Sequence, residues 1–380
     1  MKNRAGEFKK NLSGELQYSS YVLRSLPPDP PIEIDQEIIS LLVKASQTLG
    51  ALDAVSSRIP NVALFVAMHV RKEALLSSQI EGTQATLDDI LDPALETNTN
   101  RDVAEVVNYI KAVEFATQRM KELPLCNRLL REIHAVLLAD VRGGEKNPGE
   151  FRHSQNWIGP QGSSLKNATF IPPNPEDMQE SMSSLEAFIN REDDLDDLIK
   201  IALIHYQFET IHPFLDGNGR IGRLLITLFL REKHILAYPT LYISYFLKRN
   251  RIEYYDRMMD VRLKGTFEQW VKFFLKGLAE SAQDAMDTID RLVAMHEKNA
   301  AKVQEVKSAR KTVVKVFDYI ERRPIIDVRK TSTDLDISFN TASKAINSLI
   351  ELGILQQTQD SSRNRCFAYE EYLAILRKDT

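Results

Sequence analysis

The chain lacks the features of a secreted or disulfide-bonded protein. It has only two cysteines, Cys126 and Cys366, among 380 residues, and we place them in different domains. A structural disulfide is therefore not expected, and a reducing compartment fits this cysteine usage. Residues 1–21 carry charges without an apolar centre, so they do not have the pattern of a signal peptide. These absences favour a cytoplasmic protein.

An excess of one charge and a long hydrophobic run are also lacking. The 49 basic and 53 acidic side chains leave a net charge of -4, which argues against a general affinity for nucleic acid or an anionic membrane. We find no apolar run of the roughly 18 to 20 residues that span a bilayer, and we expect no membrane contact. With 43% hydrophobic residues, the chain can bury a large core and still carry an appended module.

What the sequence does contain is a dense cluster of chemically useful residues at positions 212–223. Apolar residues from 195 to 211 repeat with helical spacing on two faces and predict a helix buried on two sides. Pro213 disfavours helical geometry at His212, so this helix should end there. Residues 220–232 predict a second buried helix. The cluster is therefore expected in a loop between two core helices.

The second half of this loop has the composition of an anion site. Gly217 and Gly219 can take positive φ, which lets successive N–H groups converge where the second helix begins. The partial positive charge of a helix N-terminus makes phosphate the natural occupant. Arg220 and Arg223 are three positions apart on one helix face and can reach further phosphate oxygens. Together these residues predict binding of a polyphosphate.

The first half supplies a base and a carboxylate. Asp216 directly precedes the glycines, and a carboxylate beside phosphates is the usual way in which proteins hold Mg²⁺. His212 can accept a proton near neutral pH. No Ser, Cys or Lys in the motif is arranged as a covalent nucleophile. The chemistry that fits is attack by an outside hydroxyl on a metal-bound nucleotide phosphate.

These residues resemble the Fic family. Its signature, His-Pro-Phe-x-Asp/Glu-Gly-Asn-Gly-Arg-x-x-Arg, is matched at every defined position from 212 to 223. The resemblance implies a mostly helical enzyme that transfers AMP from ATP to a Ser, Thr or Tyr hydroxyl of a target protein. It assigns His212 as the general base and Asp216 as the Mg²⁺ ligand. It assigns Gly217, Asn218 and Gly219 to the phosphate loop, and Arg220 and Arg223 as the side chains that clamp the phosphates.

A second motif lies upstream, at residues 77–82. It matches the pattern Ser/Thr-x-x-x-Glu-Gly/Asn that some Fic proteins carry as an inhibitory motif. Residues 64–80 predict a helix that Gly82 closes. By resemblance, Glu81 pairs with Arg223 and blocks the γ-phosphate position, with Ser77 supporting it. A related possibility is that Glu81 positions a water that removes AMP again, as some relatives do.

Two further regions are predicted to contact substrates. Residues 155–160 and 168–173 are short extended runs and predict a small hairpin whose open edge can accept a target strand. This hairpin resembles the Fic flap, and its expected docking residues are Trp157, Ile158, Gly159, Thr169 and Phe170. We expect Tyr255 to contact adenine through its ring or hydroxyl, with helix packing as the alternative. Arg262 stands where some relatives carry an amide.

The C-terminal part has its own pattern. Residues 283–311 are a charged, Ala-rich helical stretch that links onward. Helices are expected at 313–321, at 327–335, and after a cap at Asn340, with Gly353 as the stop. Strands are expected at 355–359 and 363–369, joined by 360–362. This is the order of a winged helix-turn-helix domain, a fold that often binds DNA.

DNA binding and protein interaction both remain open for this domain. Residues 301–380 carry 14 Lys and Arg against 11 Asp and Glu, a net of +3 that is a mild bias for a nucleic-acid surface. The side chains that could reach bases or phosphates are Thr341, Ser343, Lys344, Asn347, Arg363 and Arg365.

The sequence thus predicts a mainly α protein with three parts: an N-terminal helical region carrying the inhibitory motif (1–110), a Fic-type catalytic core with a β-hairpin flap (111–300), and a winged helix (301–380). We expect an autoinhibited protein adenylyltransferase that uses ATP and Mg²⁺. The alternatives are a DNA-binding regulator that senses a nucleotide, and a Fic enzyme that mainly removes AMP. The target, the modified residue type and homodimer formation stay open.

Overall fold

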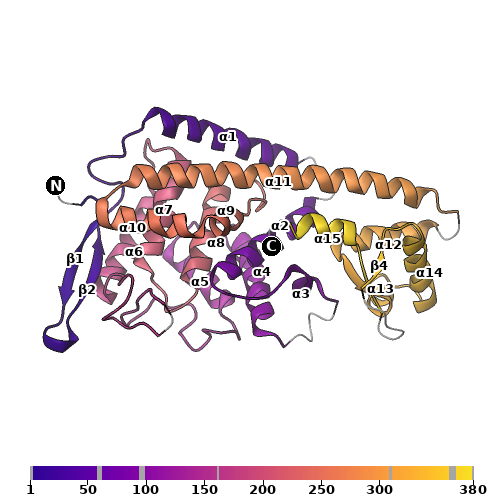
Figure 1. The fold of residues 1–380 in the computed structure, drawn as a ribbon, viewed down its shortest axis with the longest axis horizontal. Coiled ribbons are helices and arrows are strands. Elements are labelled where there is room, and N and C mark those ends of the chain that lie inside the picture. The colour runs from indigo at the N-terminus through magenta and orange to yellow at the C-terminus, as the bar shows by residue number, and fades with distance from the viewer. Residues whose placement is uncertain are drawn as a thin grey trace.

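The structure is a computed structural model that describes residues 3–57, 62–93, 99–160, 162–307, 310–358 and 365–378. It is predominantly helical, as expected, with helices packed around a central pair (Figure 1). That pair is α7 (Asp197–Ile211) and α8 (Asn218–Glu232), in which every residue from Leu198 to Ile211 and from Asn218 to Leu230 is buried. Helix α7 has apolar side chains on all faces, and such a helix must be surrounded by others. Helix α8 is buried together with polar residues of the motif, including Arg220 and Arg223.

The other helices of the catalytic part surround this pair. They are α2 (Val62–Ile80), α3 (Leu87–Leu91), α4 (Arg101–Arg119), α5 (Asn127–Leu137), α6 (Pro175–Asn190), α9 (Ser244–Arg249) and α10 (Arg251–Lys264). Their ends carry the expected caps: Asn174 accepts from the N–H of Asp177, and Thr86 forms a capping box with Asp89.

A single long helix, α11 (Phe267–Gln304), runs from the catalytic part to the C-terminal part (Figure 1). It begins well before the predicted position 283, because aromatic residues at its start, including Phe267 and Trp270, are buried in the catalytic core. Helix α1 (Gln36–Ser56) lies along it.

Helix α1 corrects the expectation that no segment could span a membrane. By length and composition alone it is apolar enough to cross one. Glu37, Lys44 and Asp53 fall within it, so the run of apolar residues is interrupted and was not recognised. One face of the helix, including Ile38 and Leu49, is buried.

An N-terminal hairpin was not predicted. Strands β1 (Gly6–Asn11) and β2 (Tyr18–Leu23) pair antiparallel and project from the body beside the flap (Figure 1). The N–H of Tyr21 donates to the carbonyl of Ile171, 3.0 Å away, which ties the hairpin to the flap. Mixed charged and polar residues hid the alternation that marks a strand.

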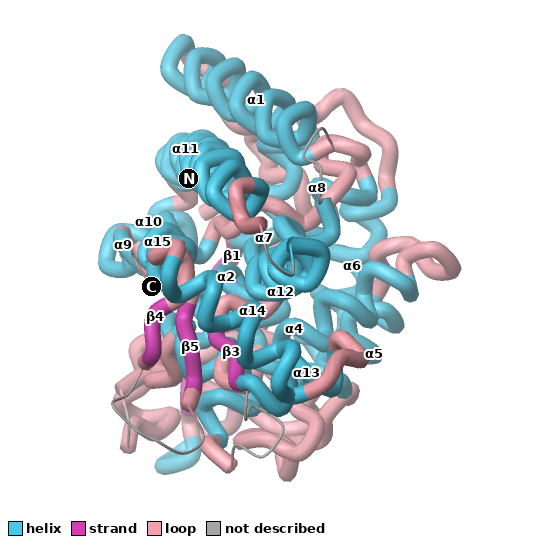
Figure 2. Tube along the Cα trace, turned by 90° about the vertical axis from the view of Figure 1, so that its right-hand side faces the viewer, coloured by secondary structure: helices cyan, strands magenta, loops and turns pink. Residues whose placement is uncertain are grey.

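The C-terminal part has its elements in the predicted order. They are α12 (Arg310–Arg322), β3 (Ile325–Asp327), α13 (Val328–Asp334), α14 (Phe339–Glu351), β4 (Gln356–Gln357), β5 (Cys366–Ala368) and α15 (Glu370–Leu376). The strands form one antiparallel sheet in the order β3-β5-β4 (Figure 2). Its assignment to the winged-helix class stays a prediction.

Several details of this part differ from expectation. Ser338, not Asn340, caps α14, because the Ser338 hydroxyl accepts from the N–H of Thr341. Strand β3 and helix α15 were missed. Gly353 ends α14 with a φ of 67°, as predicted. The predicted strand connection at 360–362 and Arg363 lie outside the described residues. Both cysteines are free, as expected.

Candidate active site

The motif lies in the predicted loop between α7 and α8. Helix α7 ends at Ile211, and His212 adopts the left-handed conformation with φ 51° and ψ 59°. Gly217 is left-handed as well, with φ 76°, and precedes the first residue of α8. The helix boundary expected from Pro213 is therefore confirmed. Two sharp backbone turns, one at each end, fold the loop over the start of α8.

Side-chain amides hold the loop in this shape. The amide of Asn218 donates to the carbonyl of Phe214 over 2.8 Å and accepts from the N–H of the same residue, also over 2.8 Å. Asn156 donates from outside the loop to the carbonyls of His212 and Phe214, at 3.1 and 3.0 Å. Both ends of the Asn218 amide are thus bonded to the loop backbone. Asn218 can contribute to phosphate binding only by holding the loop in shape and through its backbone N–H.

Arg152 clamps the loop to the base of the flap. Its guanidinium is buried and donates to the carbonyls of His212 (3.0 Å), Pro173 (2.5 Å) and Ser154 (3.2 Å). Burial lowers the pKa of Arg152 to about 10. A buried guanidinium that satisfies carbonyls from separate segments fixes those segments relative to each other.

His212 is neutral in this environment. Burial, and then the nearby Arg152 charge, lowers the pKa of His212 to about 4. Its Nδ1 lies 3.4 Å from the carbonyl oxygen of Glu209, so a proton on Nδ1 is directed at that oxygen and Nε2 keeps a lone pair. A neutral imidazole with an open nitrogen can act as a general base.

Asp216 is presented at the mouth of the loop. Its carboxylate lies 2.9 Å from the ammonium of Lys146 and accepts from the N–H of Gly217 over 2.7 Å. Burial alone would raise the pKa of Asp216, but Lys146 and Arg220 hold it below its ordinary value. The group is therefore an ionised carboxylate, the donor type that Mg²⁺ prefers.

His134 supports Asp216 from behind. Its Nδ1 accepts from the N–H of Gly149 over 2.9 Å, which places the proton on Nε2, 3.0 Å from the carbonyl of Asp216. The ring stacks on Phe214 with centroids 3.8 Å apart. Burial lowers the pKa of His134 to about 4, so it holds the loop as a neutral donor.

Gly219 serves a different purpose from the one expected. It lies within α8 and is absent from the positive-φ glycines of the described chain. A Cβ at this position would come within 2.1 Å of Glu81 Oε1 and 2.9 Å of an Arg223 nitrogen. Glycine is therefore needed here for close approach of other groups, which corrects the prediction of a second left-handed turn.

Arg223 is held by the upstream motif, as the resemblance implied. Its Nε donates to the Ser77 hydroxyl over 2.8 Å, and one terminal nitrogen donates to the Ser77 carbonyl (2.9 Å) and to Glu81 Oε1 (2.6 Å). Burial alone would raise the pKa of Glu81, but Arg223 lowers it, so the pair is ionised. Helix α2 ends at Ile80 and Gly82 follows with φ 99°, as expected.

Arg220 is buried and faces α4. Its guanidinium lies 3.3 Å from the carboxylate of Glu105 and 3.6 Å from that of Asp216. Arg142 lies on the other side of Glu105, at 3.1 Å. The two motif arginines are thus oriented by separate carboxylates, Arg220 by α4 and Arg223 by the end of α2.

Glu209 adds a second buried carboxylate beside Arg223. One turn before His212, its Oε1 has no hydrogen-bond partner among the described residues. Burial raises the pKa of Glu209 to about 7. Its charge state therefore changes near neutral pH.

The flap is smaller than predicted. The two runs pair only at Ile158 and Phe170, through backbone hydrogen bonds of 2.8 and 3.0 Å. The Phe170 ring is buried beneath Arg262, whose guanidinium carbon lies 3.9 Å from its centroid. Phe170 thus anchors the flap, which corrects its expected role as a docking side chain. Trp157, Gly159 and Thr169 are exposed.

The predicted adenine contact lies close to the same site. Tyr255 is 39% exposed, and the guanidinium of Arg251 lies 5.8 Å from its ring centroid. Burial raises the pKa of Tyr255, with the Glu81 charge as the next cause. Its neighbour Tyr254 is committed to the core, where its hydroxyl bonds His205 over 2.9 Å.

Sequence reasoning missed five residues that orient the loop: Glu105, His134, Arg142, Lys146 and Asn156. Two signals were available. Glu105 is a carboxylate on the otherwise apolar face of a helix, and Lys146 lies in a Gly-, Asn- and Pro-rich loop at 143–149. No group of three or more His, Cys, Asp or Glu side chains suited to a metal occurs in the described part of the chain.

Comparison with known proteins agrees with this geometry. Residues 39–118 match the family model "Fic/DOC family N-terminal" and residues 124–230 match "Fic/DOC family". "Protein adenylyltransferase Fic" of Culex quinquefasciatus is 36% identical over 147 residues, which are 38% of this chain and 26% of that protein. The protein of the same name from Drosophila mojavensis is 27% identical over 268 residues, 67% of this chain and 47% of that protein. The chain therefore spans less than half the length of either relative.

Two solved structures share the fold. A Fic family protein from Desulfovibrio desulfuricans G20 aligns with a TM-score of 0.57 and 21% identity, covering 89% of this chain and 97% of that one. A segment of Fic-1 from C. elegans aligns with a TM-score of 0.50 and 19% identity, covering 67% and 73%. With both family models matched in sequence and the motif residues gathered in one loop, this chain belongs to the Fic/DOC family.

Proposed function

We propose that this protein transfers AMP from ATP to a hydroxyl group of a target protein, and that Glu81 holds it inactive. The observation that carries the proposal is the Arg223 guanidinium, which comes from the second turn of α8 and is occupied by Ser77 and Glu81 at 2.6 to 2.9 Å. The names of the curated relatives support the activity.

The chemical step follows from the neutral base and the anion cradle. The target hydroxyl gives its proton to Nε2 of His212, while its oxygen forms a bond to the α-phosphorus of ATP. The bond from that phosphorus to the β-phosphate oxygen breaks, and pyrophosphate leaves. The start of α8 and Arg220 stabilise the negative charge on the phosphates. The flap contacts the target through its exposed residues Trp157, Gly159 and Thr169.

Asp216 fits a divalent cation shared with the substrate. It is an ionised carboxylate at the loop mouth, with Lys146 as its ammonium partner. Since no larger ligand cluster surrounds it in the described residues, Mg²⁺ would be held by one carboxylate together with phosphate and water oxygens. When bound, the ion neutralises phosphate charge.

Autoinhibition follows from competition for one guanidinium. While Glu81 occupies Arg223, that side chain cannot pair with the γ-phosphate. The Glu81 side chain is 34% exposed, so water can replace its contacts and the closed state can open. A tenfold preference for the closed state needs only about 1.4 kcal/mol.

The test measures transfer of label from α-labelled ATP with Mg²⁺ to the protein itself and to a cell lysate. Glu81→Ala should raise transfer at least tenfold over the unaltered chain. Glu81→Ala combined with His212→Ala should abolish transfer, and chelation of Mg²⁺ should do the same. Glu122→Ala, which removes another exposed glutamate, should change nothing.

The same experiment separates the alternatives. Nucleotide binding without transfer by any variant would overturn the enzyme proposal and favour a sensor. Loss of label from a pre-modified target that depends on Glu81 would indicate AMP removal instead. Equal transfer by the unaltered chain and Glu81→Ala would leave the enzyme in place but overturn the inhibitory role of Glu81.

A further inference from the structure

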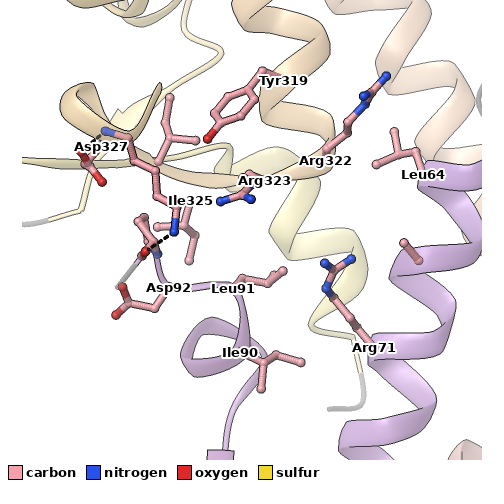
Figure 3. A pocket seen from close by; sticks show the side chains of 14 residues that line it. Leu64, Arg71, Ile90, Leu91, Asp92, Tyr319, Arg322, Arg323, Ile325 and Asp327 are labelled. Carbon is pink, nitrogen blue, oxygen red and sulfur yellow. Dashed lines mark hydrogen bonds between the residues drawn. The ribbon is translucent and has the colours of Figure 1, made fainter. Parts of the chain in front are cut away.

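A cavity that shares no lining residue with the His212 loop lies between the catalytic part and the C-terminal part (Figure 3). Its volume is about 450 Å³, within the range of small-molecule sites. One wall is formed by α2 and the end of α3. The other is formed by the end of α12, by β3 and by the start of α13. A ligand in this cavity would contact both parts of the chain at once.

The cavity has a positive charge excess and an apolar surface. Four cationic side chains and two carboxylates line it, a net of two positive charges; they are Arg71, Arg322, Arg323, Lys330, Asp92 and Asp327. Asp327 is already used to cap α13, where it accepts from the N–H of Lys330 over 2.8 Å. The apolar lining comes mainly from Leu64, Ala67, Ile90, Leu91 and Ile326.

Arg71 is the central feature. It rises from the middle of α2 into the cavity, below Arg323 (Figure 3). No hydrogen bond or ion pair to its guanidinium exists within the described residues. Burial lowers the pKa of Arg71; Tyr372 and then Glu114 oppose this shift, and Arg323 adds to it. A partly buried guanidinium without a bonded carboxylate, facing another cation, is unfavourable until an anion is present.

Arg323 and Tyr319 complete the opposite side. Arg323 is 46% exposed at its side chain and lies 3.3 Å from Asp334, so its fork keeps free donors for a second partner. Its guanidinium carbon lies 5.9 Å from the ring centroid of Tyr319. Lys330 spans the gap between the two parts by donating to the carbonyl of Pro93 over 2.9 Å.

We propose that this cavity binds a small organic phosphate, whose phosphate group pairs with Arg71 and Arg323 and whose apolar body lies against Leu64, Ile90 and Leu91. Guanidinium pairs match the geometry of phosphate oxygens, which a single ammonium would not do. The limited volume of this recess between two parts of the chain favours a small molecule over a polymer. The assignment does not depend on the proposed AMP transfer.

The test uses the full chain and calorimetric titration with phenyl phosphate, inorganic phosphate and phenol as probes. Phenyl phosphate should bind measurably and at least tenfold more tightly than inorganic phosphate, because only the ester fills the apolar wall. Phenol should not bind. Arg71→Gln and Arg323→Gln should each weaken phenyl phosphate at least tenfold. The matched control is Arg329→Gln, which removes the same charge from α13 outside the cavity and should bind normally.

Three outcomes would overturn the proposal. Absence of phenyl phosphate binding would do so directly. Equal binding by the unaltered chain and both cavity variants would place the anion at the His212 loop. Equal affinity for phenyl phosphate and inorganic phosphate would show an adventitious anion site without recognition of the organic body. Arg323→Gln alters an exposed side chain, so it tests the site even if Arg71→Gln fails to fold.

Discussion

At the scale of single residues, the inhibitory pair of Glu81 and Arg223, which we call the brake, is supported by more than one contact. Ser77 contributes both its hydroxyl and its carbonyl to Arg223. Ser77→Ala removes one hydrogen bond to a charged group, worth about 1.5 to 3 kcal/mol, but leaves Glu81 in place. We expect basal AMP transfer to rise about tenfold and less than in Glu81→Ala. Ser78→Ala is the matched control, because Ser78 is also fully buried and its hydroxyl has no hydrogen-bond partner among the described residues. An equal rise in both variants would contradict a specific role for Ser77.

The role of His212 as general base leads to a prediction about how the transfer rate depends on pH. A histidine accepts a proton only when it is neutral, so transfer is present above its pKa and lost as pH falls through it. Because burial lowers the pKa of His212 to about 4, transfer by Glu81→Ala should not fall with a midpoint near 6.5. The measurement is the transfer rate from about pH 5 to pH 8.

One other group can titrate in this range and needs a control. Burial raises the pKa of Glu209 to about 7, so Glu209→Gln is introduced into the Glu81→Ala background. Because the Glu81 charge also raises the pKa of Glu209, this group should titrate below pH 7 in the Glu81→Ala background. A limb that disappears in Glu209→Gln belongs to Glu209. A limb near pH 6.5 that persists in Glu209→Gln would show that His212 has an ordinary pKa and would contradict this prediction.

At the scale of elements, the loop and the flap act as one unit through Arg152. Arg152→Lys removes the fork that bonds the carbonyls of His212 and Pro173. We expect a loss of about 3 kcal/mol in the free energy of unfolding, together with reduced transfer in the Glu81→Ala background. Urea unfolding measures the first effect. Arg128→Lys, at a position 68% exposed, should stay within about 0.5 kcal/mol of the unaltered chain. A comparable loss in both would refute the clamp.

Prediction from sequence succeeded where local signals determine the structure. Pro213 ends α7 and Gly82 closes α2 because each restricts or permits a particular backbone conformation. The pairing of Glu81 with Arg223 was predicted from the resemblance of two short motifs to the Fic family. Gly219 was misread because its requirement is close approach of Glu81, and that contact depends on the packing of α2 against α8.

The parts that were missed depend on long-range packing. Glu105 on α4 contacts Arg220, and His134 on α5 contacts the backbone of Asp216. The local sequence around Glu105 and His134 does not predict these partners. The β1–β2 hairpin is held by Tyr21, which bonds a flap residue 150 positions later in the chain. Such contacts become visible only when the elements are assembled.

At the scale of the whole molecule, the C-terminal part is joined to the catalytic part in two ways. Helix α11 is continuous between them. Helix α15 is followed by Arg377 and Lys378, which pair with Asp88 and Asp284 at 2.7 and 3.0 Å. The cavity described above lies where α2 and α3 meet α12 and β3. Glu81 sits in the short connection between α2 and α3, so both helices that lead to it contact the cavity.

This arrangement predicts an effect of the cavity ligand on the brake, which rests on the proposed AMP transfer. The cavity and the Glu81–Arg223 pair exist in the same conformation, so a ligand of the cavity should stabilise that conformation. We expect phenyl phosphate at saturation to lower basal transfer by the unaltered chain several-fold, and to leave Glu81→Ala and Arg71→Gln unaffected. By reciprocity, saturating ATP should weaken phenyl phosphate binding by the factor by which phenyl phosphate weakens ATP binding. Equal inhibition of Glu81→Ala would instead show direct competition at the phosphate loop, because that variant has no brake left to stabilise.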